Sequence, residues 1–86
     1  MLKVKIKFLG ILNDYIDEIT LDIKQNSKII EIRNQITEHI VKSNLKHLKE
    51  TVERSIFSDE KEILNETVYV ISKDCTIYLL PPFSGG

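Results

Sequence analysis

The hydrophobic period of this chain changes from two residues to 3.6 near residue 28, and this change restricts the folds that it can adopt. Residues 2–8 alternate lysines with an apolar set, Leu2, Val4, Ile6 and Phe8. Residues 19–23 repeat the alternation with Ile19, Leu21 and Ile23. Strict alternation predicts half-buried strands. Two strands joined by a loop through Gly10 form an antiparallel hairpin.

The helical period begins after a polar break at 25–27. Apolar residues then recur at i, i+3, i+7 and i+11, as Ile29, Ile32, Ile36 and Ile40. This narrow stripe predicts an amphipathic helix of about four turns, with Ser27 as its N-cap. A shorter second helix is predicted from the face shared by Leu45, Leu48 and Val52.

The second half of the chain is less regular. Residues 53–67 are rich in charge, and 56–57 and 63–64 flank a polar turn, which predicts a short strand pair. Two apolar runs follow at 68–71 and 77–80. The last run has no polar alternation, which favours a central strand covered on both faces.

Hairpin, helix and last strand together predict an α+β fold with a mixed sheet, one main helix packed across it and a short second helix. If the last strand lies beside the first, the two run parallel and the helix is their crossover. That arrangement is the β-grasp, or ubiquitin-like, fold. We expect one domain over residues 1–82. Pro81 and Pro82 end the last strand because neither can donate to a β ladder, so 83–86 form an extended, flexible C-terminal tail.

Composition excludes several classes of protein. The chain has 12 basic and 13 acidic side chains, a net charge of −1, which argues against a nucleic-acid partner. The lysine row at residues 3, 5 and 7 is expected to be a solvated sheet face. No apolar run approaches the length of about 20 residues that a membrane span needs. The start lacks a signal-peptide pattern and there is a single cysteine, so we expect a cytoplasmic protein.

Side-chain chemistry offers few candidate sites. Neither His39 nor His47 has a second ligand at a recognised spacing, and one thiol is too few for a structural zinc ion. We therefore expect no metal site, and a structural role for Cys75. The apolar loop 9–16 and the exposed side of the last strand are predicted to form a hydrophobic docking patch.

The C-terminus is the most informative motif. Gly85 and Gly86 are two of only three glycines. Glycine has no Cβ, so this end can pass through a narrow channel and bend inside it. The Gly86 carboxylate can then act as a reactive group in another protein's active site. Terminal Gly-Gly alone is a weak signal, but a compact domain and a Pro-Pro stop make it strong.

The stretch Leu79-Leu80-Pro81-Pro82-Phe83-Ser84-Gly85-Gly86 resembles the C-terminus of the small subunit of molybdopterin synthase, the MoaD family of ubiquitin-like sulfur carriers. The resemblance implies that an E1-like adenylyltransferase uses ATP to adenylate Gly86. Sulfur from a donor protein then gives a thiocarboxylate. The tail enters the large subunit of molybdopterin synthase, where sulfur is transferred during molybdenum cofactor biosynthesis.

The resemblance also implies roles for the tail residues. Gly86 is the covalent carrier, Gly85 its flexible neighbour, and Pro81 and Pro82 the rigid base. Phe83 is an apolar anchor in the partner's channel, and Ser84 is small enough to pass. The carrier has no catalytic side chain and binds no cofactor, since the activating enzyme uses the ATP. Family members often have a glycine-containing acidic turn where this chain has 73–75.

Two other functions fit the same features. A ubiquitin-like protein modifier would be conjugated to target lysines through Gly86. A sulfur carrier of the thiamine pathway is a third possibility, although such carriers are usually shorter and lack the Pro-Pro step. A structural domain whose tail has no function is the remaining alternative.

Overall fold

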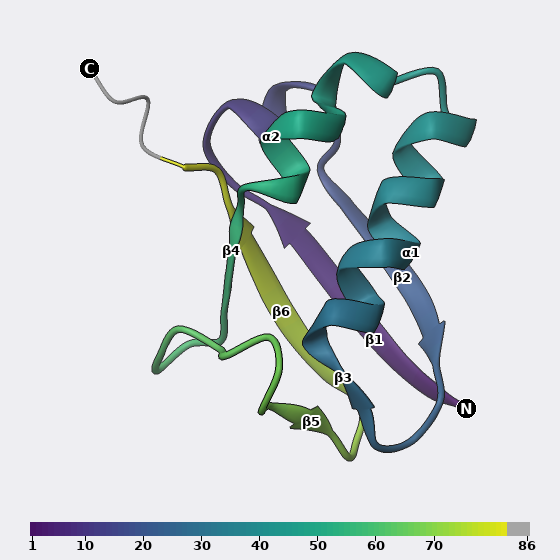
Figure 1. Cartoon of the computed structure of the whole chain (residues 1–86), viewed down its shortest axis with the longest axis vertical. Helices are drawn as coiled ribbons and strands as arrows, with labels where there is room; N and C mark the ends of the chain where they lie inside the picture. Colours follow the sequence, from purple (N-terminus) through teal and green to yellow (C-terminus); the bar gives the residue numbers. More distant parts are fainter. Residues whose placement is uncertain (83–86) are drawn as a thin grey trace.

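The computed structural model describes residues 1–82, which form a mixed four-stranded sheet with helices on one face (Figure 1). Residues 83–86 lie outside the described part. The strand order is β2-β1-β6-β4, with bounds Glu18–Ile23, Leu2–Phe8, Cys75–Leu80 and Ile56–Ser58. β1 pairs antiparallel with β2 and parallel with β6, and β4 pairs antiparallel with β6. The predicted hairpin, parallel pairing and β-grasp architecture are confirmed.

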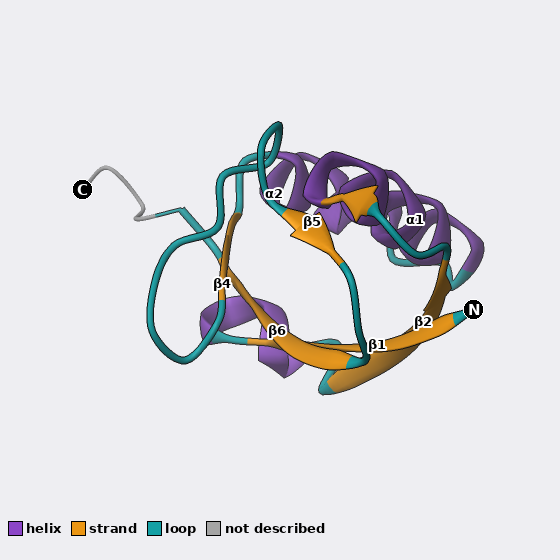
Figure 2. Cartoon of the chain, turned by 90° about the horizontal axis from the view of Figure 1, so that it is seen from below, coloured by secondary structure: helices purple, strands orange, loops and turns teal. Residues whose placement is uncertain are grey.

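The main helix, α1 (Ile29–Lys42), packs across one face of this sheet (Figure 2). Its four stripe isoleucines, Ile29, Ile32, Ile36 and Ile40, are each 0% exposed. They belong to one core cluster with the inward residues of β1, among them Val4 and Ile6. Full burial of such a side chain contributes about 1.5–3 kcal/mol, so this stripe fixes the helix on the sheet.

The N-cap of α1 is Lys28, so the prediction of Ser27 was wrong. Ser27 lies instead in β3 (Ser27–Lys28), which pairs antiparallel with β5 (Val70–Ile71) in a second, two-stranded sheet. The Lys28 backbone N–H donates to the Glu31 carboxylate at 2.6 Å. The helix is thus capped from inside its own first turn, where an acidic side chain also favours the helix dipole.

The predicted second helix is present as a 3₁₀ turn, η2 (Lys46–Leu48), followed by α2 (Lys49–Glu53). Leu48 and Val52 are buried, as their spacing predicted. A further 3₁₀ turn, η1 (Gly10–Asp14), was not predicted. It places Leu12, 1% exposed, in the core.

The last strand is central, as predicted, but it is not covered on both faces. Ile77 and Leu79 are buried, whereas Thr76 is exposed and Tyr78 and Leu80 are half-buried. α1 and α2 both lie on the same face of the sheet (Figure 2). An apolar residue at position 80 does not require a second covered face, because apolar atoms supply much of any folded protein's surface.

Residues 53–67 form the predicted strand pair only in part. β4 pairs with β6 along one edge and is joined to Ile63 by a single bridge at Ser58. The Asp59 carboxylate closes the turn by accepting hydrogen bonds from the backbone N–H groups of Lys61 (2.7 Å) and Glu62 (2.8 Å). These bonds hold the pKa of Asp59 below its usual range.

A buried arginine, which the sequence did not reveal, ties the two halves of the chain together. Arg33 on α1 is 8% exposed and forms an ion pair with Glu66. Its guanidinium donates to three backbone carbonyl oxygens, those of Val52 (2.6 Å), Glu53 (3.1 Å) and Ser55 (2.7 Å). It also lies 4.8 Å from the ring centroid of Phe57. Arg33 therefore supplies hydrogen-bond donors to the carbonyl groups at the C-terminal end of α2 and holds the loop that contains Glu66.

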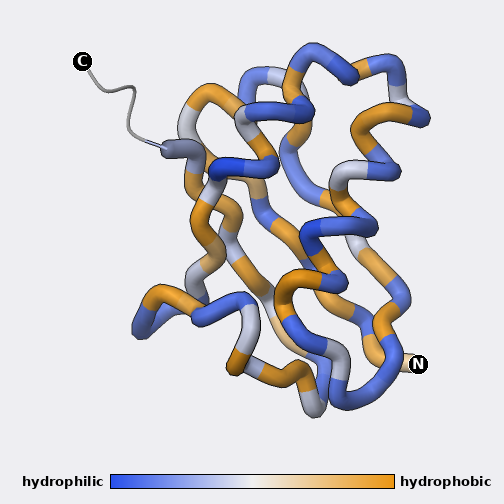
Figure 3. The backbone as a smooth tube through the Cα atoms, in the orientation of Figure 1, coloured by the Kyte–Doolittle hydropathy of each residue, from blue (hydrophilic) through white to orange (hydrophobic). Residues whose placement is uncertain are grey.

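Among residues 1–82, no helix combines the length and apolarity that a membrane crossing requires. Hydrophobic and hydrophilic residues alternate along β1. Along α1, hydrophobic residues return about once per helical turn (Figure 3).

We expect Arg33→Met to lower the free energy of unfolding by about 3 kcal/mol, the scale for removing one partner of a buried ion pair. The carbonyls of α2 and the Glu66 carboxylate would lose their donor. Urea unfolding followed by circular dichroism measures this loss. Arg54→Met is the matched control, because Arg54 is exposed and its Glu50 contact is 3.8 Å long. Equal stability of the two variants would contradict this role for Arg33.

Candidate functional site

The described base of the tail is Pro81 and Pro82, which follow β6 directly and are half-buried. The other predicted site residues, Phe83, Ser84, Gly85 and Gly86, lie outside the described residues. The Leu9 N–H donates to the Leu79 carbonyl at 3.1 Å, which extends the β1–β6 pairing beyond Phe8. On the opposite side, Leu80 pairs with Ile56 of β4. The tail therefore starts from a strand that is held on both edges.

An apolar groove of about 480 Å³ lies beside the tail base. Three exposed or partly exposed side chains form its walls, Leu9 (37%), Ile56 (41%) and Ile63 (70%). The rest of its lining is Gly10, Ser58, Leu80, Pro81 and Pro82. This exposed apolar surface is therefore a candidate interaction site.

The predicted docking patch is thus present in altered form. The structure brings the start of the 9–16 loop to the end of β6, as predicted. Sequence reasoning missed Ile56 and Ile63, because their place in the groove depends on pairing between β4 and β6 and on the 59–62 turn. The one available signal was their apolar character within a charged stretch.

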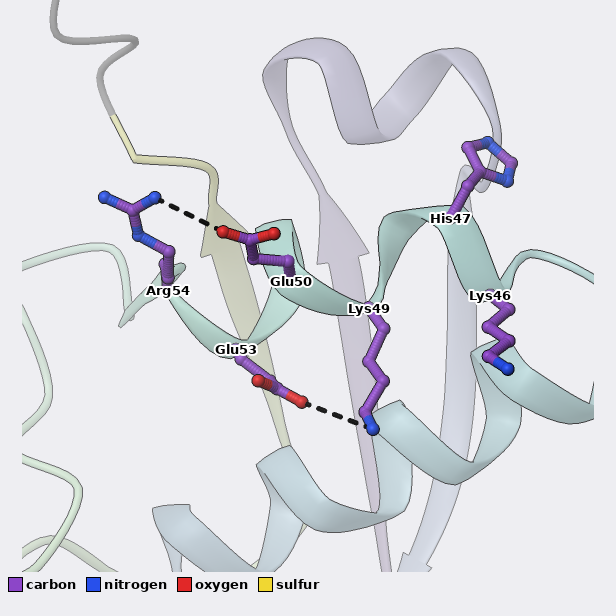
Figure 4. A pocket seen from close by; sticks show the side chains of 6 residues that line it. All are labelled: Lys46, His47, Lys49, Glu50, Glu53 and Arg54. Carbon is purple, nitrogen blue, oxygen red and sulfur yellow. Dashed lines mark ion pairs between the residues drawn. The ribbon is translucent and has the colours of Figure 1, made fainter.

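A second depression, of about 660 Å³, lies over η2 and α2, and most of the residues that line it are charged (Figure 4). Its lining residues are Lys46, His47, Lys49, Glu50, Glu53 and Arg54. Two ion pairs cross it, Lys49–Glu53 and Arg54–Glu50, each at 3.8 Å and largely exposed. Surface pairs of this type contribute little. Three basic and two acidic side chains line it, and four of these five are already paired with one another, so the lining offers little free charge to a ligand.

The structure does not bring the histidines and the thiol together. His47 stacks edge-on against Tyr15, with ring centroids 5.1 Å apart. His39 is exposed on α1. Cys75 is the first residue of β6, which begins at the end of the sheet away from α2 (Figure 1). Within residues 1–82, no group of three or more His, Cys, Asp or Glu side chains is placed to hold a metal ion.

Cys75 is half-buried and packs against the core. Burial, together with the negative charge of Asp74, raises the pKa of its thiol. The Asp74 carboxylate also accepts a hydrogen bond from the Lys3 N–H at 2.9 Å, joining the start of β6 to the start of β1. The 73–75 segment thus has a structural role in this chain.

No family model and no curated protein sequence matches this chain. Solved structures do match it over nearly its whole length. The UBL domain of Plasmodium falciparum Dsk2 has a TM-score of 0.63 and 19% identity, covering 94% of this chain and 97% of that one. Caldiarchaeum subterraneum ubiquitin has a TM-score of 0.64 and 15% identity, covering 99% and 98%.

A third match is a Pyrococcus furiosus protein provisionally described as molybdopterin converting factor, subunit 1. Its TM-score is 0.69 at 16% identity, and the match covers 95% of this chain and 99% of that one. The chain has the ubiquitin-like β-grasp fold. At these identities the likeness shows the fold alone.

We expect iodoacetamide to alkylate Cys75 more slowly in the folded protein than in urea at neutral pH. The raised pKa leaves less of the reactive thiolate in the folded state. The folded rate should increase as the pH rises through that higher pKa. Mass spectrometry of timed samples measures both rates, and faster alkylation of the folded chain would indicate an activated thiol.

Proposed function

We propose that this protein is a sulfur carrier, the small subunit of a molybdopterin synthase, which holds sulfur as a thiocarboxylate on Gly86. The observation that supports this best is the position of the tail base. Pro81 and Pro82 leave a central strand beside an apolar groove and directly precede Phe83-Ser84-Gly85-Gly86. The likeness to the Pyrococcus furiosus protein agrees with this proposal.

The chemistry needs only the terminal carboxylate from this chain. A carboxylate is a poor electrophile, so an E1-like adenylyltransferase would transfer AMP from ATP to it and release pyrophosphate. Sulfide (HS⁻) released from a donor protein then attacks the carbonyl carbon, and the C–O bond to AMP breaks. AMP leaves, and the product is the thiocarboxylate. The carrier contributes no catalytic side chain to these steps.

The apolar groove is the proposed docking surface for the large synthase subunit. Stable interfaces need a desolvated apolar core surrounded by polar residues. The groove offers that apolar core next to the tail base, so docking would bring the tail to the partner's active site. The groove's partly exposed wall residues, above all Ile63, would lose their contact with water on binding.

We expect incubation with ATP, the cognate activating enzyme and a sulfur donor to exchange one terminal oxygen for sulfur. Intact-protein mass spectrometry detects the corresponding gain in mass. A variant that lacks Gly86 should show no gain, yet its unfolding curve should match that of the full chain, because the described core is built from residues between Val4 and Leu79. Absence of the gain in the full chain with a competent enzyme would refute the sulfur-carrier proposal.

We expect Ile63→Asp to weaken binding of the large subunit by about thirtyfold, or about 2 kcal/mol, the scale of an interface hot spot. Val68→Asp is the matched control. Both residues are 70% exposed, but only Ile63 lines the groove. Isothermal titration calorimetry measures both affinities, and equal losses would exclude the groove as the docking surface.

A protein modifier is the competing function, because two of the structural matches are ubiquitin or a ubiquitin-like domain. It would form isopeptide bonds between Gly86 and target lysines. Adducts of the full chain in lysate that are absent with the Gly86 deletion would favour this alternative. A thiamine-pathway carrier would form the same thiocarboxylate but would not bind the large synthase subunit.

A further inference from the structure

Gly10 occupies a position where a side chain is excluded for two independent reasons. Its φ is +61°, in the left-handed region that favours glycine. A Cβ at this position would also lie 2.8 Å from Cγ and 3.2 Å from Cδ of Pro81. Gly10 therefore sits directly against the ring of the first tail-base residue.

This contact lies where backbone pairing of the last strand stops. Leu79 still accepts from the Leu9 N–H, and Leu80 still pairs with Ile56. Pro81 has no N–H to donate. Beyond Leu80 the path of the chain is therefore set by how the Pro81 ring packs, and Gly10 forms one side of that packing.

Gly10 is itself held on a fixed support. It begins η1, whose Leu12 side chain is in the core. The backbone N–H groups of Tyr15 and Ile16 donate to the Leu12 carbonyl at 3.1 and 2.9 Å, and the Phe8 N–H donates to Asp17 at 3.0 Å. A new side chain at position 10 would consequently displace Pro81 more easily than it would displace η1.

We infer that Gly10 is a positioning residue that sets the direction in which the tail leaves the domain. The inference rests on the proposed function, in which the tail enters a partner's channel while the groove holds the body in place. A displacement of Pro81 then moves the point from which the chain leaves the described part of the domain. Small misplacements of a reacting group lower rates strongly, by up to about a hundredfold per ångström.

The test compares four proteins: the unchanged chain, Gly10→Ala, Pro81→Ala, and Gly10→Ala/Pro81→Ala. Alanine at 81 lacks Cγ and Cδ, the two atoms that a Cβ at 10 would meet. Residual dipolar couplings of the amides of Phe83, Ser84 and Gly85 report the direction of the tail relative to the body. This measurement does not depend on any sulfur chemistry.

We expect Gly10→Ala to change these couplings while those of α1 remain the same. The double variant should match Pro81→Ala in the tail couplings, since the clash with the proline ring is gone. The strain of a Cβ at the positive φ of position 10 remains and should lower the stability of both variants that carry Gly10→Ala. If Gly10→Ala does not fold, the test depends on the double variant and Pro81→Ala. The inference then holds only if Pro81→Ala by itself alters the tail couplings. Unchanged tail couplings in every folded variant would overturn the inference.

The functional readout is the rate of thiocarboxylate formation with the cognate activating enzyme. We expect Gly10→Ala to lower kcat at least about tenfold, with a smaller change in KM because Gly10 also lines the groove, and the double variant to recover to the level of Pro81→Ala. A rise in KM alone would assign Gly10 to docking and reject a positioning role. If the unchanged chain is never activated, the proposed function fails, whereas the couplings still decide whether Gly10 directs the tail.

Discussion

The parallel pairing of β1 with β6 is the constraint on which the rest of the molecule depends. It runs in register from Val4 opposite Cys75 to Phe8 opposite Leu79. Parallel strands need a long crossover connection, and α1 provides it by packing across the face it must cover. The pairing also puts the C-terminal strand in the middle of the sheet, where both of its edges are hydrogen-bonded. The end of the chain, usually the least constrained part of a domain, here starts from one of its most constrained strands.

α1 and α2 cover one face of the four-stranded sheet, and the opposite, outer face has two different halves. Over β1 and β2 it is charged, with Lys3 paired to Asp22 and Lys5 to Glu18 at 3.5 Å. The bond to Asp22 raises the pKa of Lys3. Over the ends of β6 and β4 the surface becomes the apolar groove. A partner that buried the apolar half would meet the charged half at its rim, which would define one orientation of this chain on that partner. Arg33 supports this arrangement from the inside, because it holds both α2 and Glu66 of the loop that includes Ile63.

The sequence predicted those elements whose signals are local and periodic. The alternation in residues 2–8 and the isoleucine stripe of α1 each lie within one element, so the local spacing of apolar residues was enough to locate them. Ser27 failed as a cap because its strand pairing with Ile71 is a long-range contact that no local pattern reveals. Arg33 was missed for the same reason, since its acceptors lie 19 to 33 residues further along the chain. The groove was half predicted, because an apolar residue such as Leu80 gives the same signal whether it faces the core or the solvent.

The shortness of the tail constrains how a carrier of this design could use its partners. Gly86, the proposed carrier residue, is four positions after Pro82, and four extended residues span at most about 13 Å. An enzyme that activates Gly86 and a subunit that accepts its sulfur would both have to contact the body close to Pro81. Their binding surfaces would then overlap around Leu9, Ile56 and Leu80, so the two partners would bind one after the other. The apolar groove would therefore serve every partner that needs the terminal carboxylate, and discrimination between partners would depend on the charged half of the same face.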